Sequence, residues 1–237
     1  MNRMRPILYS LMIVSCLTLL LWARPIRTTA TERSDGGGDT GSNVSAMPKQ
    51  CRPGKTSTEA LGWRWKPNTH VRLYYLKNNF SEAEAKAFSR AINNWNSALR
   101  EIDSRVVLTT GGMTESISED NGSITVMRGI PKGKERLGEI KFYSMSNGVE
   151  HMLIIISPVV RDLDALTSLM AHEIGHSLGL ADCYGCRRGT TTMAAFKDDN
   201  KGNDVFEPSE CDKYVVAAGY SSEHDALKAR VTATTQK

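Results

Sequence analysis

The hydrophobic positions near the start of the candidate domain change from a strand period to a helical period. Residues 69–76 (THVRLYYL) alternate in the way typical of a strand. After Ser81, apolar residues recur every three or four positions to about Arg100, which predicts an amphipathic helix. Ser81 and Glu84 have the spacing of a capping box at its first turn. We expect the core-facing stripe of this helix to be Ala85, Phe88, Ala91, Ile92, Trp95 and Leu99.

The middle of the chain predicts the rest of a sheet and a second helix. Further strands are expected at 106–109, 123–127, 139–144 and 151–157. Asn147-Gly148 would be the turn of a hairpin, and the continuous apolar run Met152–Ile156 predicts a buried strand. A second helix is expected from about Asp162 to Leu178. This order of elements predicts one α+β domain over residues 61–220.

The formal charge of +4 is concentrated at the N-terminus. The chain has 30 Lys and Arg against 26 Asp and Glu, and the part after residue 30 is neutral by count. Residues 7–23 form an uncharged apolar run between two basic pairs, which is typical of a secretory signal at 1–30. A retained signal anchor, or a lipoprotein processed at Cys16, are the alternatives. We therefore expect no nucleic-acid partner, and membrane contact only through an N-terminal anchor. The two basic pairs are Arg3, Arg5, Arg24 and Arg27.

Residues 31–60 are rich in Gly, Ser, Thr and Asp at their start, so a flexible linker or pro-segment is expected there, with a short tail at 221–237. Export implies an oxidising compartment, and the even number of cysteines after Cys16 predicts two disulfides. Three pairings are open. A CxxC pair can also hold zinc or carry redox chemistry, but a single copy in an exported chain favours a disulfide. The candidates are Cys51, Cys183, Cys186 and Cys211.

The candidate chemistry lies in Ala-His-Glu-Ile-Gly-His-Ser-Leu-Gly-Leu-Ala-Asp, at the end of the second predicted helix. His172 and His176 are four residues apart, so both imidazoles project from one helix face and suit one tetrahedral Zn²⁺. Glu173 lies beside them, where it could contact a water on the metal. Gly179 can end the helix and return Asp182 as a third ligand. Three protein ligands leave an open position, as in catalytic zinc sites.

This segment resembles the extended motif of the metzincin metalloproteases, His-Glu-x-x-His-x-x-Gly-x-x-His/Asp. With Asp182 in the third place it is most similar to the snapalysin group of small secreted bacterial proteases, and the resemblance covers about residues 69–196. Aspzincins also use Asp, but the Gly179 spacing favours the metzincins. The resemblance implies a mixed, twisted sheet of about five strands, two long helices, zinc in the cleft and a small irregular C-terminal subdomain. It makes Met193 the candidate for the methionine turn beneath the metal. Unlike matrixins, the chain has Asp182 rather than a third His, and no Tyr follows Met193.

The resemblance also implies a function. We expect a secreted, monomeric endopeptidase with one catalytic Zn²⁺, in which Glu173 acts as general base and then general acid on a protein or peptide substrate. The substrate would lie extended along an edge strand near residues 138–144. Two alternatives remain open: an exported zinc-containing binding module without activity, and a zinc hydrolase of a non-peptide amide such as cell-wall material.

Overall fold

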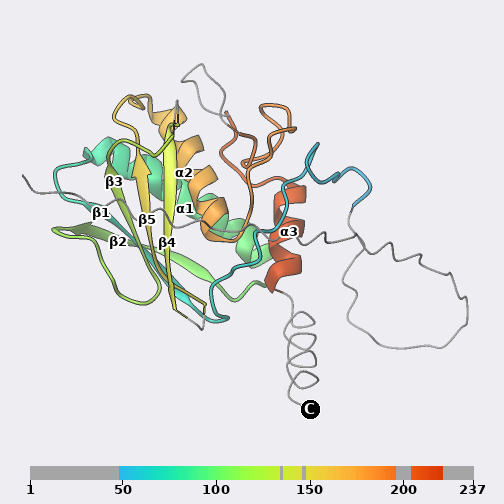
Figure 1. Ribbon diagram of the computed structural model, residues 1–237, viewed down its shortest axis with the longest axis horizontal. Coiled ribbons are helices and arrows are strands. Elements are labelled where there is room, and N and C mark those ends of the chain that lie inside the picture. The colour runs from blue at the N-terminus through green and yellow to red at the C-terminus, as the bar shows by residue number, and fades with distance from the viewer. Residues whose placement is uncertain (1–47, 134–135, 146–147, 196–203, 221–237) are drawn as a thin grey trace, which may run out of the picture. The chain divides into compact units, whose positions relative to one another are not determined.

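The computed structural model describes residues 48–133, 136–145, 148–195 and 204–220 (Figure 1). Contacts divide the chain into Met1–Ser42 and Asn43–Lys237, and every described residue belongs to the second unit. The expected signal at 1–30 and tail at 221–237 lie outside the described residues. Within the described ranges, no helix is both long and apolar enough to cross a membrane.

A mixed five-stranded sheet organises the domain. Its order is β2-β1-β3-β5-β4, with parallel pairs throughout except for the antiparallel hairpin of β4 and β5. This confirms the α+β class and the five strands expected from the sequence. It also places β4 at one edge. The strands are β1 (His70–Leu76), β2 (Val107–Thr114), β3 (Ser123–Arg128), β4 (Gly138–Met145) and β5 (Gly148–Ile156).

Two helices, α1 (Glu82–Glu101) and α2 (Leu163–Ser177), pack against each other and cover one face of the sheet (Figure 1). The expected capping box at α1 is present, with Ser81 and Glu84 bonded reciprocally. The predicted stripe is buried at Phe88, Ala91, Ile92, Trp95 and Leu99, whereas Ala85 is only partly buried. The apolar side chains of α1 and α2 share one core with β1, β3 and β5.

A third helix, α3 (Glu210–Tyr220), follows the irregular C-terminal part and was not among the predicted elements. Figure 1 shows α3 away from the sheet, near the loop after α2 and the segment that begins at residue 48. The disulfide between Cys51 and Cys211 joins that segment to α3. A second disulfide joins Cys183 and Cys186. The structure therefore selects one of the three pairings that the sequence left open.

The segment before residue 61 is packed into the domain from Cys51 onward. Cys51, Ser57 and Thr58 are buried. The backbone N–H of Leu61 donates to Gly179 O at 2.7 Å, and that of Ala181 donates to Glu59 O at 2.8 Å. These bonds hold the segment against the turn that follows α2.

A buried ion pair ties the start of α1 to the end of β3. Arg128 bonds to Glu84, and both side chains are about nine-tenths buried. Arg128 also donates to Ser157 O at 2.8 Å, after β5. Burial by itself raises the pKa of Glu84, but hydrogen bonds from Ser81 and Arg128, with the Arg128 charge, lower the pKa below its ordinary value overall.

Candidate metal centre

The end of α2 brings the predicted ligands to one place. Its last carbonyls are satisfied by a Schellman motif, in which Leu180 N donates to Gly175 O at 3.1 Å and Gly179 N donates to His176 O at 2.9 Å. Gly179 has φ +92°, and a Cβ there would lie 2.4 Å from Trp63 O. A side chain at this position is therefore disfavoured both by the left-handed backbone conformation and by the clash with Trp63 O. The reversed chain then carries Asp182 back towards the helix.

His172, His176 and Asp182 converge as the sequence predicts, with one ligand atom from each lying within 4.8 Å of the others. Asp182 Oδ1 is 3.1 Å from His172 Nε2 and 3.4 Å from His176 Nε2. The two imidazole rings meet nearly edge to face, with centroids 4.6 Å apart. This arrangement presents two nitrogens and one oxygen to a common point.

Backbone carbonyls fix the orientation of both imidazoles. His172 Nδ1 is 2.8 Å from Thr192 O, and His176 Nδ1 is 2.7 Å from Leu180 O. Because a carbonyl oxygen only accepts, each Nδ1 carries the hydrogen, and the neutral ring then turns the lone pair of Nε2 towards Asp182. A lone pair and a carboxylate oxygen repel at such short distances unless a proton or a metal ion lies between them. The donor set therefore fits a divalent metal ion.

The acidic and basic groups of the cluster shift each other's pKa strongly. Burial raises the pKa of Asp182, but the hydrogen bonds and charges of the two imidazoles outweigh it and hold that pKa well below its ordinary value. Burial lowers the pKa of His176, yet the bond to Asp182 and the charges of Glu173 and Asp182 raise it overall. Both shifts describe an ionised Asp182 paired with protonated imidazole, the state in which a proton rather than a metal ion links the side chains.

Glu173 lies beside the three ligands in a buried position. Its Oε2 is buried and has no hydrogen-bond partner among the described residues. The carboxylate faces β4 closely, because a Cβ on Gly138 would lie 2.1 Å from Glu173 Oε1. Burial raises the pKa of Glu173, and the charges of His176 and His172 oppose that shift. A buried carboxylate with a free oxygen is equipped to accept a proton from a nearby water.

Tyr184 supports the third ligand from the solvent side. Its hydroxyl donates to Asp182 Oδ2 at 3.1 Å, which leaves Oδ1 to face the histidines. The negative charge of Asp182 and this hydrogen bond raise the pKa of Tyr184. Tyr184 is only two residues after Asp182 in the sequence, but that spacing alone does not indicate a role.

Met193, the predicted turn methionine, is fully buried against the helix turn that bears the histidines. A Cβ on Gly175 would lie 2.3 Å from Met193 Sδ and 3.2 Å from Trp95 Cζ2. Trp95 Nε1 donates to Ala171 O at 2.7 Å, just before the first histidine. The helix, the tryptophan and the methionine thus pack without room for one more carbon.

Asp212, a residue that the sequence did not indicate, makes several hydrogen bonds to the turn that precedes Met193. Asp212 is fully buried in the first turn of α3 and accepts hydrogen bonds from the hydroxyl of Thr191 and, at 3.1 Å each, from the backbone N–H and hydroxyl of Thr192. The Thr192 carbonyl in turn orients His172. Ser209 and Asp212 also bond reciprocally as a capping box, so their spacing could have signalled α3.

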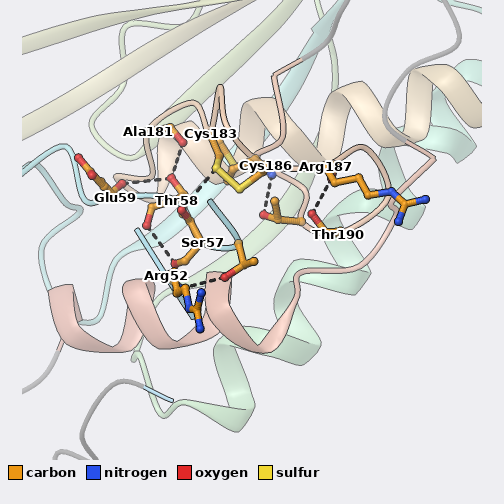
Figure 2. Close-up of a disulfide and its surroundings, with 12 residues drawn as sticks. Arg52, Ser57, Thr58, Glu59, Ala181, Cys183, Cys186, Arg187 and Thr190 are labelled. Carbon is orange, nitrogen blue, oxygen red and sulfur yellow. Dashed lines mark hydrogen bonds between the residues drawn. A yellow bond between two sulfur atoms is a disulfide. The ribbon is translucent and has the colours of Figure 1, made fainter. Parts of the chain in front are cut away.

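The loop that carries Asp182 is braced by a disulfide and by the N-terminal segment. Figure 2 shows the Cys183–Cys186 disulfide beside Ser57 and Thr58. The Thr58 hydroxyl donates to Ala181 O, and Cys183 N donates to Met193 O at 2.7 Å. The residues on both sides of Asp182 are therefore held to other parts of the fold.

The candidate site lies on the wall of an open cavity of about 390 Å³ between β4 and α2. Besides Glu173 and the three ligands, its lining includes Trp63, Phe142 and Arg136. No described carboxylate lies within ion-pair distance of Arg136. The sequence suggested the strand wall of this cleft through the family resemblance, but gave no sign that the segment around Trp63 forms part of it.

Comparisons with known proteins leave the family of this chain open. No family model matches the chain, and no curated protein matches it. Among solved structures, the chain is similar to one titled "Structure of a chaperone-substrate complex", with a TM-score of 0.37 and 13% sequence identity. That match covers 65% of this chain and spans 36% of the other.

Proposed function

We propose that this protein is a zinc-dependent endopeptidase with a metzincin-like site. One observation carries the proposal: His172, His176 and Asp182 converge on a common point in an open cleft, beside the buried and unpaired carboxylate of Glu173. A structural metal site would be closed by a fourth protein ligand, whereas these three ligands leave room for water and substrate.

The donor set favours zinc among the common metal ions. Two imidazole nitrogens and one carboxylate suit Zn²⁺ in tetrahedral or five-coordinate geometry, whereas Ca²⁺ and Mg²⁺ prefer oxygen ligands. When bound here, zinc would acidify a water molecule and polarise a carbonyl group. The short Nε2 to Oδ1 distances of 3.1 and 3.4 Å are consistent with ligands that gather around one ion.

Glu173 supplies the proton transfer in this proposal. Its free Oε2 would take a proton from the attacking water and return it to the nitrogen of the leaving amine. Gly138 permits the close approach of Glu173 to β4, which brings the carboxylate to the strand where the substrate would bind.

The substrate would bind as an added strand. β4 is an edge strand that pairs only with β5 among the described strands. Residues 138–140 and 142 of β4 line the cleft, so an extended peptide bound there could hydrogen-bond to the free edge of the strand by β-augmentation. The two disulfides fit an oxidising compartment, which agrees with secretion.

Purified protein from which metal has been removed should regain hydrolysis of casein or of a mixed peptide library with one equivalent of Zn²⁺. Glu173→Gln should still bind one Zn²⁺ but lose activity by about a thousandfold or more, since proton transfer is worth about 10²–10⁴. Glu150→Gln, on β5 outside the cleft lining, is the matched control.

Hydrolysis that persists in Glu173→Gln or in chelator would contradict the proposal. Tight zinc binding without turnover of any peptide would point to the exported binding module instead. Turnover of peptidoglycan but not of peptides would point to a cell-wall amidase.

A further inference from the structure

Two aromatic rings form one end of the cleft that holds the candidate metal centre. The ring centroids of Trp63 and Phe142 are 4.1 Å apart, with an interplanar angle of 53°. Both side chains are half-buried and both line the cavity. The rings therefore pack on each other while part of their apolar surface stays open to the cleft.

The Trp63 ring is held in a fixed position relative to the metal ligands. Its Nε1 donates to His176 O at 3.2 Å. The Trp63 carbonyl occupies the space that a Cβ on Gly179 would need, and Leu61 N donates to Gly179 O at 2.7 Å. An aromatic surface fixed before binding loses little freedom when a ligand packs on it, which favours affinity.

Phe142 lies on the same face of β4 as the residues nearest to Glu173. Gly138, Ile140 and Phe142 alternate along the strand and all line the cavity. Four residues of strand span about 13 Å, so the aromatic pair lies roughly three to four peptide residues from the position beside Glu173. An extended peptide that pairs with β4 would thus place a side chain against the two rings.

The cleft lining around Trp63 and Phe142 is apolar, which favours apolar substrate side chains over charged ones. The side chains are those of Leu61, Trp63, Ile140 and Phe142. The charged lining residues of this part of the chain, Arg136 and Glu139, lie just before β4 and at its start, nearer to Gly138 than to Phe142. A charged substrate side chain placed here would lose water without gaining an ionic partner. A phenyl ring would gain both apolar burial and ring contacts.

We propose that Trp63 and Phe142 form a subsite for an aromatic side chain of an extended peptide, located several residues from the cleaved bond. The proposal rests on the proposed function for the cleavage itself, but the binding it describes does not require turnover. Phe142 and Trp63 are thus specificity-determining residues of the cleft.

The first measurement is binding to zinc-loaded Glu173→Gln, which cannot cleave the probe. The probes are alanine-rich decapeptides in which one Phe is moved through each position, and the readout is calorimetry. We expect one register in which Phe binds about tenfold tighter than Ala, or more, from burial of the ring. Equal affinity of all registers with the all-alanine peptide would overturn the subsite.

The second measurement uses variants in the same Glu173→Gln background. Phe142→Ala should remove most of the preference for Phe, and Phe142→Leu should keep part of it, with an unchanged melting temperature for the leucine variant as the check on folding. Tyr143→Ala is the matched control, since Tyr143 stacks on His151 and is absent from the cleft lining. Retention of the full preference in Phe142→Ala would contradict the proposal.

Turnover by the wild-type protein separates this proposal from the proposed function. Phe-dependent binding with no peptide hydrolysis would retain the subsite and reject the peptidase. Hydrolysis with the same kcat/KM for every position of Phe in the peptide would support the peptidase and reject the subsite.

Discussion

At the scale of single residues, the absence of a side chain shapes this site as much as the ligands do. Gly138 leaves room for the Glu173 carboxylate, and Gly175 leaves room for Met193 beneath the helix. The motif predicted His172 and His176 because their spacing is local to one helix. It could not show what lies against the intervening glycine, because that contact depends on the path of a distant loop.

Gly175→Ala should destabilise the fold by about 1–3 kcal/mol despite alanine's better helix propensity, because the new methyl group overlaps Met193. Urea unfolding measures the change. Gly219→Ala in α3 is the matched control, since nothing lies within 4 Å of its Cβ position. That variant should be unchanged or up to about 1 kcal/mol more stable. Equal effects at the two positions would refute the packing explanation.

Tyr184→Phe should weaken zinc binding by about tenfold, because Asp182 loses the hydrogen bond that directs Oδ1 towards the histidines. Competition with a chelator measures the affinity. The Tyr184 side chain is largely exposed, so the free energy of unfolding of the metal-free protein should change little. Tyr143→Phe, which leaves the site intact, should keep full affinity, and a matching loss there would rule out this role of Tyr184.

At the scale of elements, the structure follows local patterns closely and departs from them where distant segments meet. The capping box and apolar stripe predicted α1, since both depend on neighbours within a few turns. The strand expected at 106–109 extends to Thr114 as β2, because pairing with β1 continues across a bulge and two glycines that interrupt the pattern. The strand order and the position of α3 depend on contacts between distant residues, which a single sequence does not reveal.

Asp212 links α3 to the candidate metal site, so its replacement should affect both stability and metal binding. In Asp212→Asn, the amide group offers one acceptor oxygen where the carboxylate receives several donors. We expect a loss of about 2–4 kcal/mol of stability and about tenfold weaker zinc binding through Thr192 and His172. Glu210→Gln, exposed in the same helical turn, should change neither quantity much. Loss of stability with unchanged zinc affinity would show that α3 does not orient His172.

The Glu84–Arg128 pair should make stability depend on pH. The folded pKa of Glu84 lies below its unfolded value, so its contribution is present above about pH 4.5 and is lost as pH falls through the folded pKa. Glu84→Gln should cost about 3 kcal/mol at pH 7, because Arg128 stays buried without its partner, and the cost should shrink towards pH 3. Unfolding curves at pH 7, 5, 4 and 3 measure this dependence.

The control for this prediction is Glu82→Gln, which removes only an exposed pair with Lys86 and should lower the free energy of unfolding by less than about 1 kcal/mol. A cost independent of pH would exclude the ion pair as its source.

At the scale of the whole molecule, two disulfides of very different reach hold the irregular part of the chain. Cys51 and Cys211 are 160 residues apart, whereas Cys183 and Cys186 are three apart. The even cysteine count predicted two bridges, but the pairing follows from how the N-terminal segment meets α3. The long bridge restricts the unfolded chain far more than the short one does.

Replacing both members of the long bridge with serine should lower stability by about 4–5 kcal/mol, as expected for closing a loop of this length. The Cys183→Ser, Cys186→Ser variant should lose much less stability, and its main effect should be weaker zinc binding through the Asp182 loop. Thermal unfolding and chelator competition on both variants test this. The reverse ranking of the two stabilities would contradict the loop-length argument.

The long bridge also limits where the chain could be cut if its N-terminal part is removed. The segment from Cys51 to Trp63 runs from the bridge to the cleft, where Leu61 and Trp63 line the cavity. A single proteolytic nick between Cys51 and Leu61 would leave two polypeptides joined through Cys211, which migrate together on a non-reducing gel and separate on a reducing one. Cleavage that releases an N-terminal peptide therefore has to occur before Cys51. The new N-terminus would then lie close to a segment that is itself packed into the domain.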